Sequence, residues 1–296
     1  MPRGRVGLRV DVITGHTRAA GVIGSPIRHS LSPAIFNAAF TAAGLDWAYL
    51  AFEVPEGAAG LALAGVRALG IEGLSVTMPH KAAVIDGLDS LSEDAEALGA
   101  VNCISRRGGL LHGDNTDGPG FLDALRLDEG IDVAGSRCAV VGAGGAGRAV
   151  ARALGQAGAA SIAVINRSAK PAELAVRLAG PAARVGKPAD VETADLVVNA
   201  TPLGMGVVVS TDGAPEPLPL DVTRLHAGQV VVDLVYHPAA TPLLTAARAQ
   251  GLRTVNGLGM LIHQAAHAFR LWTNEDPPLE AMSAAAVVGL GHRQRP

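Results

Sequence analysis

Aromatic residues are scarce in this chain of 296 residues, where tryptophan, tyrosine and phenylalanine together make up 3% of the sequence. Hydrophobic residues still account for 49%, with alanine and valine prominent. The core must therefore be built from small and branched side chains, which requires close contacts between its elements. The 37 glycines follow no collagen period. Such a content is typical of α/β nucleotide-binding folds, with their tight loops and close backbone approaches.

Cysteine is scarce, and runs of like charge and long apolar stretches are missing. Cys103 and Cys138 lie in the apolar runs AVNCIS and RCAVVG, which predicts buried thiols and excludes a disulfide or metal framework. The net charge is −3, from 24 basic and 27 acidic residues without a charged run, so nucleic acid is not an expected partner. No stretch approaches about 18 uncharged apolar residues, and no apolar leader follows the N-terminus. We expect a soluble, cytoplasmic protein without a membrane partner.

The first half of the chain alternates strand-like and helix-like segments. AAGVIG, AYLAFEV and GLSVT are predicted strands, whereas SPAIFNAAFTAAG and EGAAGLALAGVRALG are predicted helices. This alternation indicates βαβ units and hence a mostly parallel sheet covered by helices. A short capped helix in SLSEDAEALGA precedes a predicted hairpin, whose strands VNCISRR and LLHG meet at Gly108 and Gly109.

A second alternation of strands and helices begins at residue 137. The length of the chain also suggests two domains, at about 150 residues each. Strands are predicted in RCAVV, SIAVINR, ADLVVNAT, QVVVDLVY and RTVNG, and helices in GRAVARALGQAG, KPAELAVRLAG and TPLLTAARAQG. Residues 201–225 are predicted to form a long surface loop. The last two predicted helices follow the second sheet and are free to pack on the first domain. We expect residues 1–117 with 257–296 to form one domain, and residues 118–256 to form a Rossmann domain.

A glycine loop opens the second domain. Gly142, Gly144 and Gly147 form GxGxxG between the strand CAVV and a helix that begins near Ala146. The first glycine allows the turn, the second lets the backbone approach a pyrophosphate, and the third lets helix and strand pack closely. The loop, with Ala143 and Gly145, therefore predicts a dinucleotide site. A glycine-rich turn without a ligand is the alternative in a chain so rich in glycine.

The end of the next strand distinguishes NADP from NAD. An NAD site places an acid about 20 residues after the loop, to bind the ribose 2′-hydroxyl. This chain instead has Asn166, Arg167 and Ser168, then Lys170, and no acid until Glu173. A guanidinium beside a hydroxyl suits a 2′-phosphate, which a carboxylate would repel. The sequence therefore favours NADP.

Polar residues gather where the strands of the first domain end. They are Ser30, Ser32, the segment from Thr77 to Lys81, Asn102, and the segment from Asn115 to Asp117. Ligands of open α/β sheets bind beyond the carboxyl ends of strands, so these side chains are candidates for one site.

Four of these candidates, Ser30, Ser32, Lys81 and Asp117, also have a purely structural explanation. Either serine could start a helix, with Ser32 as its N-cap, and Asp117 could be an N-cap. Lys81, between the strand GLSVT and an expected helix, could be a solvated charge. His29, His80 and His112 lack metal-ligand spacing and are expected at the surface or at a rim.

Taken together, the motifs resemble those of the shikimate dehydrogenase family. They run in the family's order over residues 20–275: GSPIRHSLSPAIFN, SVTMPHK, GAVN, GDNTDGPGF, GAGGAGRA, NRS, NATPLGM, DLVYHPAATPLL and NGLGMLIHQAAHAFRLWT. The resemblance implies a two-domain enzyme that interconverts 3-dehydroshikimate and shikimate with NADPH, on the chorismate pathway to aromatic amino acids.

The resemblance also implies roles for individual residues. Ser30 and Ser32, with Tyr236, would hold the substrate carboxylate. Thr77, Asn102, Asp117 and Gln264 would hold ring hydroxyls, and Lys81 with Asp117 would form the catalytic pair. The nicotinamide would lie among Leu234, Gly257 and Met260. No metal is implied, and we expect a monomer or a homodimer.

Two alternatives remain at this stage. Many members of the family have Asn where this chain has Ser75, which bears on the contacts to the ring hydroxyls. A quinate/shikimate or aminoshikimate dehydrogenase is therefore the nearest alternative. A non-catalytic NADP-binding regulator is a second, and it predicts the loss of a catalytic group, whereas Lys81 and Asp117 are both present.

Overall fold

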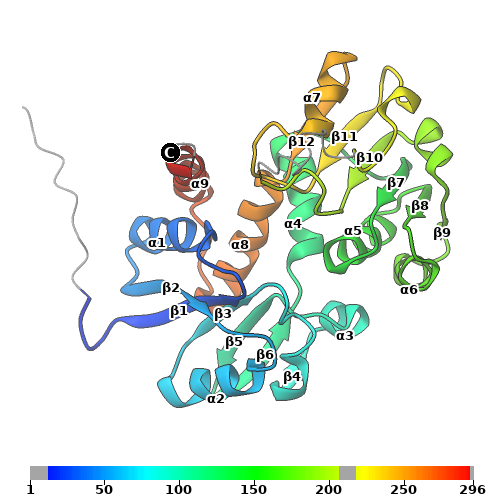
Figure 1. The fold of residues 1–296 in the computed structure, drawn as a ribbon. Helices are drawn as coiled ribbons and strands as arrows, with labels where there is room; N and C mark the ends of the chain where they lie inside the picture. The colour runs from blue at the N-terminus through cyan, green and yellow to red at the C-terminus, as the bar shows by residue number, and fades with distance from the viewer. Residues whose placement is uncertain (1–12, 207–217, 294–296) are drawn as a thin grey trace, which may run out of the picture.

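The computed structural model describes residues 13–206 and 218–293, which form two six-stranded sheets joined by helices (Figure 1). The first sheet has the strand order β2-β1-β3-β5-β6-β4. Its strands are β1 (Arg18–Gly24), β2 (Trp47–Glu53), β3 (Gly73–Val76), β4 (Ser90–Leu91), β5 (Cys103–Arg107) and β6 (Leu110–Asp114). β1, β2 and β3 are parallel, and β5 and β6 form the predicted antiparallel hairpin.

Helices cover both faces of the first sheet. α1 (Ser32–Ala43) packs on one face, and α2 (Ala59–Leu69) packs on the other; α3 (Glu93–Leu98) follows β4. Most of the few aromatic side chains gather on the α1 face, where the rings of Phe36 and Tyr49 stack with centroids 4.5 Å apart. Because aromatic side chains bury large apolar areas, this cluster compensates for their scarcity.

The second sheet is entirely parallel, in the order β12-β11-β10-β7-β8-β9. Its strands are β7 (Arg137–Val141), β8 (Ser161–Ile165), β9 (Ala183–Val185), β10 (Leu196–Asn199), β11 (Val230–Asp233) and β12 (Arg253–Asn256). Its helices are α5 (Gly145–Gln156), α6 (Ala169–Ala179) and α7 (Pro242–Ala249). This strand order is that of a doubly wound dinucleotide-binding fold, in which the order of the strands reverses between the neighbours β7 and β10. The predicted α/β fold with a Rossmann domain is thus confirmed.

Two helices, α4 (Asp117–Asp123) and α8 (Leu258–Thr273), connect the two sheets, and α9 (Leu279–Arg293) follows α8. α4 continues into a π-helical turn, η2 (Ala124–Asp128), and both lie along α8. α8 and α9 return to pack on α1, as predicted (Figure 1). Phe121 and Leu125 join the core of the second sheet, although α4 directly follows the first. The exact domain limits therefore stay a prediction.

The backbone departs from the predicted elements after β3. The segment after GLSVT forms successive turns and a single 3-10 turn, Ile85–Gly87, so the predicted helix there is wrong. The reason is that the carbonyl of Lys81 accepts a hydrogen bond from the Val101 backbone N–H at 2.8 Å. In an α-helix this carbonyl would accept a hydrogen bond from within the helix. Here it accepts one from a different chain segment instead.

Several smaller expectations need correction. Ser32 is the first residue of α1 and does not cap it, because Leu31 holds the N-cap position. The short strands β4 and β9 were not predicted. Of the predicted loop at residues 201–225, residues 207–217 lie outside the described part of the chain. His80 is buried, and its Nε2 lies 2.7 Å from the Val54 carbonyl oxygen, so its expected surface position is wrong.

Two expectations from composition can be compared with the structure. Cys103 and Cys138 are both buried and unbridged, as predicted. Within residues 13–206 and 218–293, no helix has the length and apolar character needed to cross a membrane.

The contact between α4 and α8 depends on Gly120. A Cβ atom at this position would lie 2.5 Å from the backbone nitrogen of Gln264, whereas one at Gly60 in α2 would meet nothing within 4 Å. We predict that Gly120→Ala lowers the free energy of unfolding by about 1–3 kcal/mol. Gly60→Ala is the matched control and should raise it by about 0.5–1 kcal/mol. Chemical denaturation measures both, and equal effects would contradict the close approach.

Candidate active site

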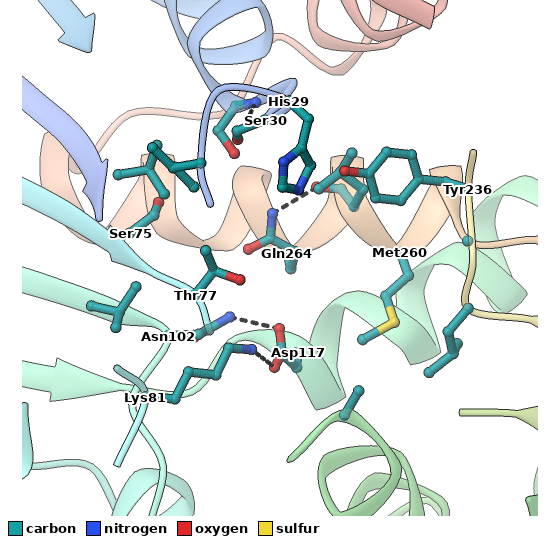
Figure 2. A pocket seen from close by; sticks show the side chains of 18 residues that line it. His29, Ser30, Ser75, Thr77, Lys81, Asn102, Asp117, Tyr236, Met260 and Gln264 are labelled. Carbon is teal, nitrogen blue, oxygen red and sulfur yellow. Dashed lines mark hydrogen bonds and ion pairs between the residues drawn. The ribbon is translucent and has the colours of Figure 1, made fainter. Parts of the chain in front are cut away.

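A pocket of about 220 Å³ opens between the two sheets, at the carboxyl ends of β1 and β3. It brings together all eight residues predicted to bind substrate: Ser30, Ser32, Thr77, Lys81, Asn102, Asp117, Tyr236 and Gln264. Figure 2 labels seven of them, all except Ser32, with their side chains facing one cavity, although they come from loops and helices far apart in the sequence. The crevice beyond the strand ends is where open α/β sheets bind ligands.

Lys81 and Asp117 form an ion pair at one end of this pocket. Lys81 Nζ lies 2.6 Å from Asp117 Oδ2, with the lysine side chain 24% and the carboxylate 9% exposed. Asn102 Nδ2 donates to the other carboxylate oxygen at 2.7 Å. Both carboxylate oxygens are thus occupied, which fixes the ammonium where a ligand in the pocket can reach it (Figure 2).

The loop before α4 holds this carboxylate in place. Asn102 Oδ1 accepts from the Thr116 backbone N–H at 2.8 Å, and Asn115 Oδ1 accepts from the Asp117 backbone N–H at 3.1 Å. Asn102, Asn115, Thr116 and Asp117 are all buried. Asp117 begins α4 without capping it, so the N-cap alternative is wrong and its carboxylate is available to Lys81.

Hydroxyl groups occupy the opposite end of the pocket. Ser30 Oγ accepts from the Ser32 backbone N–H at 3.2 Å, and both serine side chains line the cavity. Tyr236 and Gln264 face them, and Gln264 Nε2 donates to the Leu261 carbonyl of its own helix at 2.8 Å (Figure 2). The pocket therefore has one end formed by an ion pair and another end rich in hydroxyl groups, which suits a small polyhydroxylated acid.

A buried acid supports the segment that carries Leu234 and Tyr236. Asp233, at the end of β11, accepts from Asn199 Nδ2 at 2.9 Å and from Thr241 Oγ1 at 2.6 Å. Burial raises the pKa of the Asp233 carboxyl above its usual value, against the opposing effect of these hydrogen bonds. The network directs the chain out of the sheet and into the pocket wall.

The glycine loop meets the requirements of a dinucleotide site. Gly142 has φ +105°, and a Cβ atom on Gly147 would lie 2.1 Å from the Gly142 carbonyl oxygen. α5 starts at Gly145 with no side-chain cap and no acid in its first turn, which leaves its N-terminal N–H groups without a side-chain acceptor. A pyrophosphate fits there, because the helix terminus offers unpaired donors and positive potential. Ala146 of this loop reaches the pocket, as do Leu234, Gly257 and Met260.

The predicted 2′-phosphate residues lie outside the pocket, after β8. Asn166 Oδ1 accepts from the Ala143 backbone N–H at 3.1 Å, which ties this segment to the glycine loop. Arg167, Ser168 and Lys170 are exposed, and neither cation has an ion-pair partner within the described ranges. A phosphate on the ribose of a bound dinucleotide would meet two available cations and a hydroxyl.

Comparisons with known proteins agree with this geometry. Residues 22–104 match the family model for the shikimate dehydrogenase substrate-binding domain, and residues 257–287 match that for the shikimate 5′-dehydrogenase C-terminal domain. A putative NAD(P)-binding model matches residues 130–203. A shikimate dehydrogenase (NADP⁺) of Symbiobacterium thermophilum is 47% identical, over 93% of this chain and 96% of its own. The chain belongs to the shikimate dehydrogenase family.

Solved structures of this family match as well. A shikimate dehydrogenase in complex with NADP⁺ has a TM-score of 0.87 and 36% identity, covering 94% of this chain and 98% of its own. The enzyme of Thermus thermophilus, in complex with NADP(H) and shikimate, has a TM-score of 0.84 and 38% identity. That match covers 93% of this chain and 100% of the other.

Some pocket residues were not predicted from the sequence. Val22, Ile27, Val76 and Leu261 form its apolar wall, whereas His29 lies at its rim, as expected (Figure 2). The first three lie in or next to β1 and β3, so the rule that ligands bind at strand ends contained the signal. Ser75, the position at which many family members have Asn, also lines the pocket. In the described part of the chain, no group of three or more potential ligands could hold a metal ion.

The Asn102 side chain bonds to both Thr116 and Asp117 in the polar network beside the pocket. We predict that Asn102→Ala lowers the free energy of unfolding by about 1–3 kcal/mol, because it leaves buried partners unsatisfied. Ser105→Ala, in the adjacent strand β5, is the control, since Ser105 Oγ is buried without a hydrogen-bond partner. This change should cost less than about 0.5 kcal/mol. Chemical denaturation distinguishes the two, and an equal loss for both variants would contradict the network.

Proposed function

We propose that this protein is an NADP-dependent shikimate dehydrogenase, which catalyses the reversible reduction of 3-dehydroshikimate to shikimate. The observation that carries the proposal is the 2.6 Å Lys81–Asp117 pair, which faces a pocket that the dinucleotide-binding domain also lines. Relatives and solved structures with this activity in their names support it.

The two ends of the pocket suggest how the substrate lies. The carboxylate of the ring accepts hydrogen bonds from Ser30, Ser32 and Tyr236, at the hydroxyl-rich end. Thr77, Asn102, Asp117 and Gln264 hold the ring hydroxyls. This orientation directs the reacting oxygen to Lys81 and away from the serines, and the Asp117 carboxylate beside Lys81 disfavours the reverse orientation by repelling the ring carboxylate.

The chemistry requires a proton donor beside the carbonyl. NADPH, when bound, supplies the hydride. The Lys81 ammonium donates a proton to the carbonyl oxygen and stabilises the negative charge that develops on it. Asp117 keeps the ammonium in position and accepts a hydrogen bond from a neighbouring ring hydroxyl. In the oxidation of shikimate, the same lysine accepts the proton.

The cofactor preference follows from the residues after β8. Arg167, Ser168 and Lys170 present positive charge and a hydroxyl, with no acid to bind an unphosphorylated ribose. We propose that they hold the 2′-phosphate of NADP, and that Gly142–Gly147 hold the pyrophosphate. Leu234, Gly257 and Met260 flank the nicotinamide. The enzyme would act in the cytoplasm, in aromatic amino acid biosynthesis, as a monomer or a homodimer.

The proposal is tested by steady-state kinetics with shikimate and quinate, each with NADP⁺ and NAD⁺. We expect kcat/KM for shikimate with NADP⁺ to exceed the other three values by at least about tenfold. Comparable values for quinate with NAD⁺ would instead identify a quinate/shikimate enzyme. The absence of turnover with all four combinations, despite NADP⁺ binding, would identify a regulator.

Replacement of Lys81 tests the proton-transfer role. Lys81→Ala should lower kcat by about 10²- to 10⁴-fold, because general acid–base catalysis contributes that much. Its Kd for NADPH, from nucleotide fluorescence, should stay within about twofold of the wild-type value, since the lysine lies at the substrate end. Lys187→Ala, an exposed lysine of the second domain, is the control and should change neither quantity. A Lys81→Ala enzyme with near wild-type kcat would refute the role.

A further inference from the structure

The π-helical turn η2 places two consecutive acids against the segment that enters the pocket from the second sheet. π-turns are rare, occur mostly as single-turn insertions in α-helices and are frequent at functional sites. Here η2 ends at Asp128, and Glu129 follows it directly. We call Asp128 and Glu129 the acidic clasp.

The acidic clasp holds both ends of residues 253–263. Asp128 Oδ1 lies 2.9 Å from His263 Nε2 in α8, and Glu129 Oε2 lies 3.0 Å from Arg253 Nη2 at the start of β12. His263 is buried, with 4% of its surface exposed. Between these ends, a Cβ atom on Gly259 would lie 2.9 Å from Asp128 Oδ2. The first turn of α8 therefore lies close against Asp128.

The clasped segment carries one wall of the pocket. Gly257, Met260 and Leu261 line the cavity, and Gln264 follows His263 directly. Buried imidazole nitrogens need hydrogen-bond partners, and a carboxylate is a strong one. Asp128 thus fixes the rotation of α8 just where its first turn meets the cavity.

We infer that His263 and Asp128 are positioning residues, which set the nicotinamide-facing wall for hydride transfer. The inference rests on the proposed NADP-dependent activity. Neither side chain lines the pocket, so they act through Gly257 and Met260. A displacement of about 1 Å in a reacting geometry can cost about 10²-fold in rate. Loss of this pair should therefore affect turnover more than stability.

A second pair between the same elements provides a matched control. His267 Nε2 lies 2.8 Å from Asp123 Oδ2, one helical turn further along α8. Neither His267 nor Asp123 lines the pocket. Their contact also lies beyond residues 253–263, the segment that carries Gly257 and Met260. Both pairs join α4 or η2 to α8, so both contribute to the packing of these helices. Only the His263–Asp128 pair is expected to influence the cofactor.

The experiment compares His263→Leu, His263→Gln and His267→Leu in the full-length enzyme. His263→Leu should lower kcat about tenfold and raise the Kd for NADPH about threefold, while the Kd for adenosine 2′,5′-bisphosphate, which lacks the nicotinamide, stays unchanged. His263→Gln should restore both values to within about twofold, because its amide nitrogen replaces Nε2 as donor to Asp128. His267→Leu should leave kcat and both Kd values within about twofold.

Deuterated NADPH adds a readout that a purely structural role would not change. His263→Leu should increase the primary isotope effect on kcat, because hydride transfer becomes more strongly rate-limiting. Asp128→Ala, at a half-exposed position, should reproduce these changes and serves if the histidine variant does not fold. Equal effects of His263→Leu and His267→Leu, or no effect of either, would overturn the inference. Inactive wild-type protein would refute the proposed function instead.

Discussion

The burial of one carboxylate, that of Asp117, is the constraint on which the site depends. A buried carboxylate without partners would cost several kcal/mol, so the surrounding chain must supply a cation and donors. Lys81 and Asn102 occupy its two oxygens, and Asn115 holds its backbone. The same set of contacts therefore determines both the stability of the loop and the position of the Lys81 ammonium. The same bonds that satisfy the carboxylate hold the Lys81 ammonium at the pocket.

Small residues make the remaining geometry possible. Gly120 lets α4 and α8 approach closely, and Gly259 lets η2 lie against the first turn of α8. Gly147 allows the glycine loop to close on its own strand. A chain with few aromatic residues thus obtains contact between elements through close backbone approach. This packing brings a wall of the second domain to the polar residues of the first.

The sequence predicted those parts that depend on local patterns. The two α/β halves and the glycine loop follow from periodicity and turn chemistry, whereas the return of the last helices was implied by the family resemblance. Of the eight residues predicted to bind substrate, six were candidates because they follow strand ends, and Tyr236 and Gln264 came from the family motifs alone; the structure brings all eight into one pocket. The turn at Lys81 was missed because its carbonyl bonds to Val101, about 20 residues further along the chain, and no local pattern records such a bond. The buried position of His80, against Val54, and the His263–Asp128 pair were missed for the same reason.

A crystal structure of the ternary complex with NADP⁺ and shikimate tests the central claim most directly. We expect the hydroxyl that is oxidised to lie about 3 Å from Lys81 Nζ, at hydrogen-bond distance, with the ring carboxylate on Ser30 and Ser32. Lys81 should keep its contact with Asp117 in the complex. A ring bound in the reverse direction, with its carboxylate on Lys81, would contradict the proposed role of Lys81.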